Sequence, residues 1–304
     1  MTSVALTGAY ARLEDLVALR YQRLPERTTH RVIGAPGGAR LSRLKGRGID
    51  FAEVRLYQPG DDVRSIDWRV TARKARPHTK VYREERERPT LVVVDQTRSM
   101  FFGSKLRLKS VAAAETAALL AWHALAHGDR VGGVVYGDAD EHVFKPHRSA
   151  RAVLRLLRQV AESNAGLSRR TRPSGNDPLA SSLEHLTRIA RTGHRVYLVS
   201  DFAVVSQQAE RRLVRLARHN SVVAIVVADA LEAELPPADV YTVTDGSARR
   251  RLETGDGAVR ARYRARFEAE RQALAELCRG AQIELIEIPT HEAALDRLAS
   301  RLSN

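Results

Sequence analysis

The sequence predicts an α/β protein with a doubly wound, mostly parallel sheet, preceded by a small β-rich unit. Beyond Pro89, short apolar and β-branched runs alternate with long helical patterns, as in parallel strands joined by crossover helices. Before Pro89, the apolar pattern is short and interrupted by Gly and Pro. The single cysteine, Cys278, excludes a disulfide-stapled module. We therefore divide the chain into residues 1–89 and residues 90–304.

Elements of residues 1–89 follow from spacing and turn residues. Apolar side chains recur at helical spacing over residues 10–23, which predicts an amphipathic helix. Residues 52–57 and 79–82 alternate as short strands do. Turns are expected at Pro59-Gly60-Asp61 and at Arg76-Pro77, because Pro and Gly favour turn geometry.

Elements of residues 90–304 follow from the alternation of apolar runs and helical periods. Strands are predicted at 91–95, 130–136, 141–145, 195–200, 222–227, 240–244, 249–252 and 283–288. Helices are predicted at 105–127, 150–161, 177–191, 207–219, 259–279 and 292–302. The pattern of 141–145 is that of an edge strand, and the Asp-Gly pair at 245–246 predicts a hairpin.

Charge and hydropathy limit the class of protein. The chain has 43% hydrophobic residues and a net charge of +14, so it is globular and basic. Residues 1–89 hold 19 basic and 11 acidic side chains, more than half of the excess. The longest apolar stretch, 111–126, contains Glu115 and His123 and is shorter than the roughly 20 residues of a membrane span. With no visible export signal either, we expect a cytoplasmic protein.

Oxygen-bearing side chains follow two of the predicted strands and precede one helix. Ligands of doubly wound sheets bind beyond the carboxyl ends of the strands, so these side chains are candidate metal ligands. They are Asp95, Thr97 and Ser99 after the first strand, Asp201 after strand 195–200, and Asn176 and Asp177 where the preceding loop meets helix 177–191. The alternative is structural, because Asp, Ser and Thr are common in turns and at helix N-caps, and Asp177-Pro178 is a good helix start.

The chemistry of these ligands indicates binding rather than catalysis. Two neutral hydroxyls and few carboxylates would leave a divalent cation under-neutralised, with affinity for a carboxylate from outside. The sequence contains neither the phosphate-binding Gly-x-x-x-x-Gly-Lys-[Ser/Thr] loop nor the Gly-x-Ser-x-Gly nucleophile elbow. We therefore predict a protein that is not an enzyme.

Two motifs resemble known families. Asp95-x-Thr97-x-Ser99, followed by Gly128-Asp129-Arg130-Val131-Gly132, resembles a von Willebrand factor A domain with its metal-ion-dependent adhesion site. The segment from Arg55 to Trp68 is similar to the signature of the bacterial domain-of-unknown-function-58 family, and 199–202 is similar to its third metal loop. The signature residues are Arg55, Tyr57, Gly60, Asp61, Asp62, Arg64, Asp67 and Trp68.

The resemblance implies a cytoplasmic, non-enzymatic protein that works beside a MoxR-type AAA+ ATPase in the maturation or assembly of other proteins. It implies Mg²⁺ or another divalent cation, with Asp95, Thr97 and Ser99 in the first metal loop and Asp201 in the third. In the second loop, Asn176 stands where a Gly-Gly-Thr-Asp-like sequence has Thr; its amide oxygen can ligate Mg²⁺, and Asp177 can do so through water.

Two questions stay open. The signature is expected to be structural, with Ile66 and Trp68 on a buried face and Arg64 in a buried ion pair with Asp61, Asp62 or Asp67; its alternative is a partner-binding surface. For the whole chain, the alternative to a metal-dependent adaptor is a basic protein that binds nucleic acid or an anionic surface through residues 1–89. Aromatic residues make up only 5% of the chain, so stacking platforms are scarce and an acidic protein partner is favoured.

Overall fold

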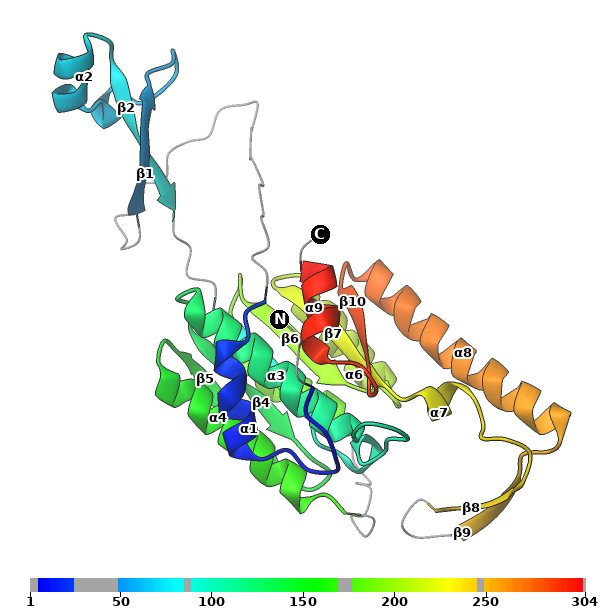
Figure 1. Ribbon diagram of the computed structural model, residues 1–304. Helices are drawn as coiled ribbons and strands as arrows, with labels where there is room; N and C mark the ends of the chain where they lie inside the picture. Colours follow the sequence, from blue (N-terminus) through cyan, green and yellow to red (C-terminus); the bar gives the residue numbers. More distant parts are fainter. Residues whose placement is uncertain (1–4, 25–48, 85–88, 169–176, 245–248, 303–304) are drawn as a thin grey trace. The chain divides into compact units, whose positions relative to one another are not determined.

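The computed structural model describes residues 5–24, 49–84, 89–168, 177–244 and 249–302. The chain forms two compact units (Figure 1). The larger comprises residues 1–29 and 88–304, and the smaller comprises residues 30–87. Each unit is described by itself.

A six-stranded sheet with the order β10-β7-β6-β3-β4-β5 forms the centre of the larger unit. Its strands are β3 (Thr90–Asp95), β4 (Val131–Tyr136), β5 (Glu141–His147), β6 (Arg195–Ser200), β7 (Ser221–Ala228) and β10 (Glu284–Pro289). All neighbours are parallel except β5, which pairs antiparallel with β4 at one edge. The chain starts at the centre, winds to one edge and then to the other, so the predicted doubly wound, mostly parallel sheet is confirmed.

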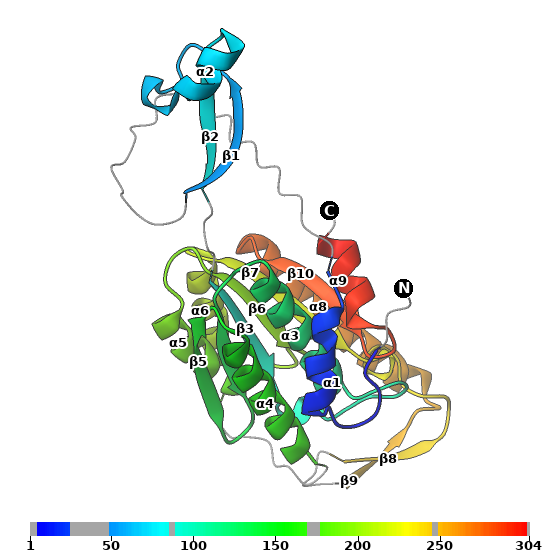
Figure 2. The same ribbon diagram turned by 60° about the vertical axis from the view of Figure 1, so that its left-hand side comes forward.

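Helices cover both faces of the sheet (Figure 2). They are α3 (Lys109–Ala126), α4 (Ala150–Gly166), α5 (Pro178–Ile189), α6 (Gln207–Ala217), α8 (Gly257–Gly280) and α9 (Ala294–Leu302). Alternate residues of β3 face opposite sides: Val92 and Val94 pack with α3, α4 and α9, whereas Leu91 and Val93 pack with α5, α6 and α8. This two-sided burial explains why β3 is a continuous apolar run in the sequence.

The amino-terminal helix belongs to the larger unit, unlike the predicted division at residue 89. It consists of α1 (Leu13–Ala18) and a 3₁₀ turn, η1 (Leu19–Tyr21). Leu16 is completely buried, and Trp122 of α3 donates its indole N–H to the Leu16 carbonyl at 3.0 Å. Helical spacing predicts that one face is buried, but it does not tell which sheet or helix covers that face.

The smaller unit is built on an antiparallel pair, β1 (Ile49–Leu56) and β2 (His78–Glu84), which confirms two predicted short strands. Between them lie a 3₁₀ turn, η2 (Val63–Ser65), and a helix, α2 (Trp68–Lys74), that was not predicted. Asp67 caps α2 by accepting hydrogen bonds from the N–H groups of Arg69 and Val70.

The remaining elements connect β7 to β10. A short helix, α7 (Ala230–Ala233), is followed by an antiparallel pair, β8 (Val240–Thr244) and β9 (Arg249–Glu253). This pairing agrees with the predicted hairpin, whose Asp-Gly turn lies outside the described residues. No helix in the described ranges is both long and apolar enough for a membrane crossing.

Candidate metal-binding site

The candidate site lies at the carboxyl ends of the central strands, where the winding direction of the sheet reverses. Asp95 ends β3, Tyr136 ends β4 and Ser200 ends β6, so parallel pairing brings the three side chains to one edge. They line a cavity of about 830 Å³ together with Thr97, Ser99 and Asp201. Asp95, Thr97, Ser99 and Asp201, which were predicted from the sequence, therefore do converge.

Asp95 is a buried carboxylate held by four hydrogen bonds. Its Oδ1 atom accepts from the Thr97 N–H at 2.8 Å and from the Thr97 hydroxyl at 2.6 Å. Its Oδ2 atom accepts from the hydroxyls of Tyr136 at 2.9 Å and Ser200 at 2.6 Å. Each oxygen is thus fixed by a neighbouring strand end or by the first turn after β3, which orients the carboxylate firmly.

Thr97 and Ser99 provide a pair of hydroxyl oxygens 3.0 Å apart, with Thr97 buried and Ser99 exposed to the cavity. Adjacent ligands of an octahedral Mg²⁺ ion, at about 2.1 Å from the metal, lie about 3 Å apart. The Thr97 hydroxyl hydrogen is directed to Asp95, so the Thr97 oxygen can only accept in its hydrogen-bond contact with Ser99, and at least one of its lone pairs stays available. The spacing and the donor chemistry both fit a hard divalent cation.

Asp201 follows β6 and is engaged on both oxygens. Its Oδ2 atom accepts a hydrogen bond from the Lys109 ammonium at 2.7 Å, and its Oδ1 atom accepts from the Ala203 N–H at 3.0 Å. The same ammonium donates to Glu232 of α7. Asp201 is therefore one end of an ion-pair network that the sequence did not predict.

Burial and neighbouring charges shift the pKa values at the site. Burial, helped by the charge of Asp201, raises the pKa of Asp95 to about 6. Burial also raises the pKa of Asp201, but the charge and hydrogen bond of Lys109 outweigh it and leave that pKa below its usual value. Burial lowers the pKa of Lys109, and the charges of Asp201 and Glu232 reverse this, so Lys109 stays charged.

Asp177 caps helix α5, which is the structural alternative weighed for it. Its Oδ1 atom accepts from the Ala180 N–H at 2.9 Å, and its Oδ2 atom accepts from the Ser206 hydroxyl. Asp177 still lines the cavity. Asn176, the other residue predicted in this loop, lies outside the described residues.

Comparison with known proteins decides the family. The family model described as "Protein of unknown function DUF58" matches residues 53–273, which is most of the chain. The chain belongs to the DUF58 family. An uncharacterised protein of Mycobacterium tuberculosis strain H37Rv, Rv1480, is 31% identical over 262 residues, covering 84% of this chain and 80% of the relative. An uncharacterised protein of Mycobacterium bovis, Mb1516, matches to the same extent.

Similar solved structures are more distant from this DUF58 protein. The conserved hypothetical protein BatB of Bacteroides thetaiotaomicron is 12% identical with a TM-score of 0.43, covering 71% of this chain and 98% of that one. Proximal thread matrix protein 1 of the mussel byssus, described with a zinc-occupied MIDAS motif, is 12% identical with a TM-score of 0.32 and covers 47% of this chain and 38% of that one.

The DUF58 signature lies in the smaller unit, where its acidic residues shape turns. Asp61 accepts a hydrogen bond from Arg55 at 2.7 Å, whereas a buried pair with Arg64 was considered from the sequence. Asp62 caps η2 through the Arg64 N–H. Arg64 is exposed, which contradicts its predicted burial, because the capping bond uses its backbone and leaves the guanidinium outside.

Three further signature residues fix the chain path or face solvent. Gly60 has a φ of +109°, a left-handed conformation that glycine adopts without strain. The Tyr57 N–H donates to the Pro77 carbonyl at 2.9 Å, one hydrogen bond beyond Leu56 and His78, which are the last paired residues of β1 and β2. Trp68 is 67% exposed at the start of α2, so its predicted place on a buried face was wrong; helical rather than strand geometry directs it outward.

Several site residues escaped the sequence reasoning. Lys109 and Glu232 come from elements 14 residues or more beyond Asp95, and neither belongs to a recognisable motif. Lys109 has one weak signal: the chain has 44 Arg and only six Lys, so each Lys stands out. Tyr136 and Ser200 end predicted strands, and inspecting strand-final polar residues would have found them.

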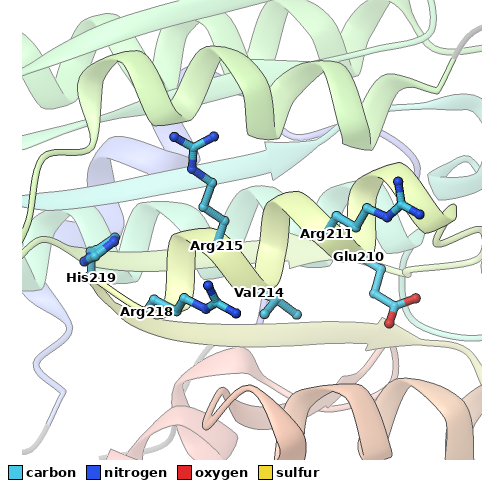
Figure 3. A pocket seen from close by; sticks show the side chains of 6 residues that line it. All are labelled: Glu210, Arg211, Val214, Arg215, Arg218 and His219. Carbon is cyan, nitrogen blue, oxygen red and sulfur yellow. The ribbon is translucent and has the colours of Figure 1, made fainter.

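A second depression, of about 380 Å³, lies on α6 and shares no lining residue with the candidate site. Figure 3 shows its arginines extending from the helix surface. The lining residues are Glu210, Arg211, Val214, Arg215, Arg218 and His219. This surface has the exposed-arginine character of a basic protein and no buried polar group directed into it is described.

Proposed function

We propose that this DUF58 protein is a non-enzymatic adaptor with a von Willebrand A-like fold that binds partner proteins through a divalent cation. The observation that supports it most is the pair of hydroxyl oxygens of Thr97 and Ser99, 3.0 Å apart beside the buried Asp95 carboxylate. Neutral hydroxyls leave most of the charge of a bound cation uncompensated, and this favours capture of an acidic side chain from outside.

In this proposal Thr97 and Ser99 hold Mg²⁺ directly. A bound Mg²⁺ would supply positive charge in the cavity. Asp95 accepts a hydrogen bond from the Thr97 hydroxyl and so orients that oxygen. Burial raises the pKa of Asp201, but Lys109, the Ala203 N–H and, last, a hydrogen bond from the Ser99 hydroxyl together lower it below its usual value. In this role Asp95 orients hydroxyl groups, since it accepts hydrogen bonds from them on both of its oxygens.

The rim of the cavity indicates what surrounds the captured carboxylate. Phe102 is 40% exposed and Val204 is 76% exposed, and both line the cavity with Tyr263 of α8. Exposed apolar side chains around a polar floor are typical of protein-binding sites. We therefore propose that the partner presents an Asp or Glu flanked by apolar residues.

The family resemblance suggests the wider role. We propose that the partner system includes a MoxR-type AAA+ ATPase in the cytoplasm, with this protein as adaptor in the maturation or assembly of other proteins. Copurification from cells with tagged protein, with and without EDTA, tests this. Loss of an AAA+ ATPase from the EDTA sample supports the proposal, and a captured set that EDTA does not change argues against it.

Metal binding itself is tested on purified protein. Titration calorimetry with Mg²⁺ is expected to give heat for the native chain and none for Thr97→Val, which removes one hydroxyl ligand. The matched control is Thr187→Val, which removes an exposed helix hydroxyl that bonds only to the local Glu184 carbonyl in the structure. Absence of heat at millimolar Mg²⁺ in the native protein would reject the metal-dependent proposal.

A second candidate function is favoured by the exposure of Trp68. This side chain lies on α2 with Arg69, Arg73 and Lys74, all exposed, and an aromatic ring beside cations can bind nucleic acid or another anionic surface. Phosphate contacts give a steep fall of affinity with salt. Binding of single-stranded DNA at low salt, lost in Trp68→Ala, would support this candidate; absence of binding at low salt would remove it.

A further inference from the structure

Lys109 is a buried cation at the candidate site that no motif accounts for. It is the first residue of α3 and only 2% of it is exposed. Its ammonium lies 2.7 Å from Asp201 Oδ2, also bonds Glu232, and is 5.9 Å from the centre of the Phe102 ring. Burying an ammonium group costs free energy unless the group is paired and hydrogen-bonded, so these partners are needed to keep Lys109 inside the fold.

The ammonium of Lys109 neutralises the charge of Asp201 within the protein. Both oxygens of Asp201 accept hydrogen bonds, one from Lys109 and one from the Ala203 N–H. Glu232 is likewise committed, with Oε1 on Lys109 and Oε2 on the Asp229 N–H at 3.0 Å. Asp95, which accepts the hydrogen bond of the Thr97 hydroxyl, has no cationic partner among the hydrogen bonds described for it.

We infer that Lys109 is a built-in counter-ion that sets the charge of the cation site. By neutralising Asp201 it weakens the binding of a divalent cation and keeps a bound cation under-neutralised, so that a carboxylate of the partner completes the site. This rests on the proposed function for its biological meaning, but the effect of Lys109 on cation affinity is measurable without any partner.

Variants separate the charge of Lys109 from the stability it provides. Lys109→Met alone leaves the buried Asp201 and the partly exposed Glu232 without their counter-ion, which endangers the fold. We therefore compare Glu232→Gln with Lys109→Met/Glu232→Gln, because this pair differs only at Lys109 and the double variant removes one charge of each sign. Lys105→Met, an exposed lysine four residues earlier, is the matched control.

Two titrations of the folded protein test this inference. Binding of Mg²⁺ is measured from the shift of the thermal unfolding midpoint, Tm, and binding of Mn²⁺ is measured by electron paramagnetic resonance. Binding to the native state raises the Tm with cation concentration, so the shift reports affinity. Removal of a nearby positive charge is expected to strengthen divalent binding at least about tenfold in the double variant over Glu232→Gln. Lys105→Met should bind like the native chain.

The outcomes distinguish this inference from the proposed function. Equal or weaker binding by the folded double variant overturns the role of Lys109, while binding by the native chain still supports the adaptor. Binding by the double variant alone supports the role of Lys109 and argues against a cation-dependent native protein. Absence of binding in every variant rejects both.

Discussion

The Nη1 atom of Arg107 lies 2.5 Å from Oε2 of Glu115, and neither side chain has more than 1% of its surface exposed. Arg107 also donates to the carbonyls of Leu6 and Glu292, at 3.2 and 2.5 Å. Glu115 accepts from the N–H of Ala294 at 2.8 Å. Glu115 lies on α3 and Arg107 lies just before it. Their buried ion pair therefore anchors both the amino-terminal segment and the start of α9.

Removing one member of this pair should be costly. Glu115→Ala leaves the Arg107 guanidinium buried without a counter-charge, and we expect a loss of about 3–5 kcal/mol in the free energy of unfolding. Urea denaturation of both proteins measures it. Glu270→Ala, which breaks the exposed pair between Arg266 and Glu270 on α8, is the control and should have no measurable effect. Similar stabilities for the two variants would contradict this assignment.

His123 should make the larger unit sensitive to acid. Burial, followed by the charges of His127 and Arg195, lowers its pKa from 6.5 to about 4. Between these values the unfolded chain binds a proton that the folded chain does not, so stability is complete above pH 6.5 and is lost as the pH falls toward 4. The loss is at most about 3 kcal/mol.

The expected signature is a Tm that falls between pH 6.5 and 4 in the native chain and falls less in His123→Gln. His147→Gln, which changes an exposed imidazole on β5, should follow the native curve. If His123→Gln keeps the full slope, other groups cause the acid sensitivity.

Tyr136 should support the charge of Asp95. Its hydroxyl donates to Asp95 Oδ2 at 2.9 Å, and hydrogen bonds to a charged group contribute about 1.5–3 kcal/mol. We expect Tyr136→Phe to lower stability by roughly this amount and to weaken Mg²⁺ binding, because Asp95 becomes harder to ionise. Chemical denaturation and calorimetry measure the two effects. Tyr21→Phe, at a residue 76% exposed, is the control and should change neither.

The two tryptophans should differ sharply in stability and in fluorescence. Trp68 is 67% exposed and Trp122 is 7% exposed. Trp122→Ala is expected to cost about 3–5 kcal/mol, because it leaves a cavity under α1, and Trp68→Ala about 0.5 kcal/mol or less. Iodide should quench the emission of Trp122→Phe, where Trp68 remains, and hardly affect Trp68→Phe. The reverse order would contradict the exposed position of the signature tryptophan.

Local patterns in the sequence were sufficient for the central sheet and part of the site. The apolar run at 195–200 matches β6 residue for residue, since a strand buried on both faces leaves a continuous apolar run. Asp95, Thr97, Ser99 and Asp201 meet as expected because parallel strands end at one edge. Lys109 and Glu232 were missed because an ion pair between residues 123 positions apart leaves no local pattern.

Exposure was predicted less well than element type. Trp68 was expected inside because alternation with Ile66 suggests a strand, yet Asp67 starts a helix there and changes the direction of the next side chain. The amphipathic helix near the amino terminus was expected in the smaller unit, but its buried face packs on α3. Periodicity describes the face of one element, whereas packing depends on elements far away in the chain.

The hydroxyl of Ser200 reaches the carboxylate of Asp95 across 105 positions of sequence. A fragment that ends before β6 would keep Asp95, Thr97 and Ser99 and yet lack one of the donors that orient the carboxylate. The short motif is therefore necessary for the site but not sufficient, and during synthesis the site can form only after β6 has emerged and joined the sheet. A cation response in this protein would then report the completion of its sheet, which makes it a reporter of folding as well as of binding.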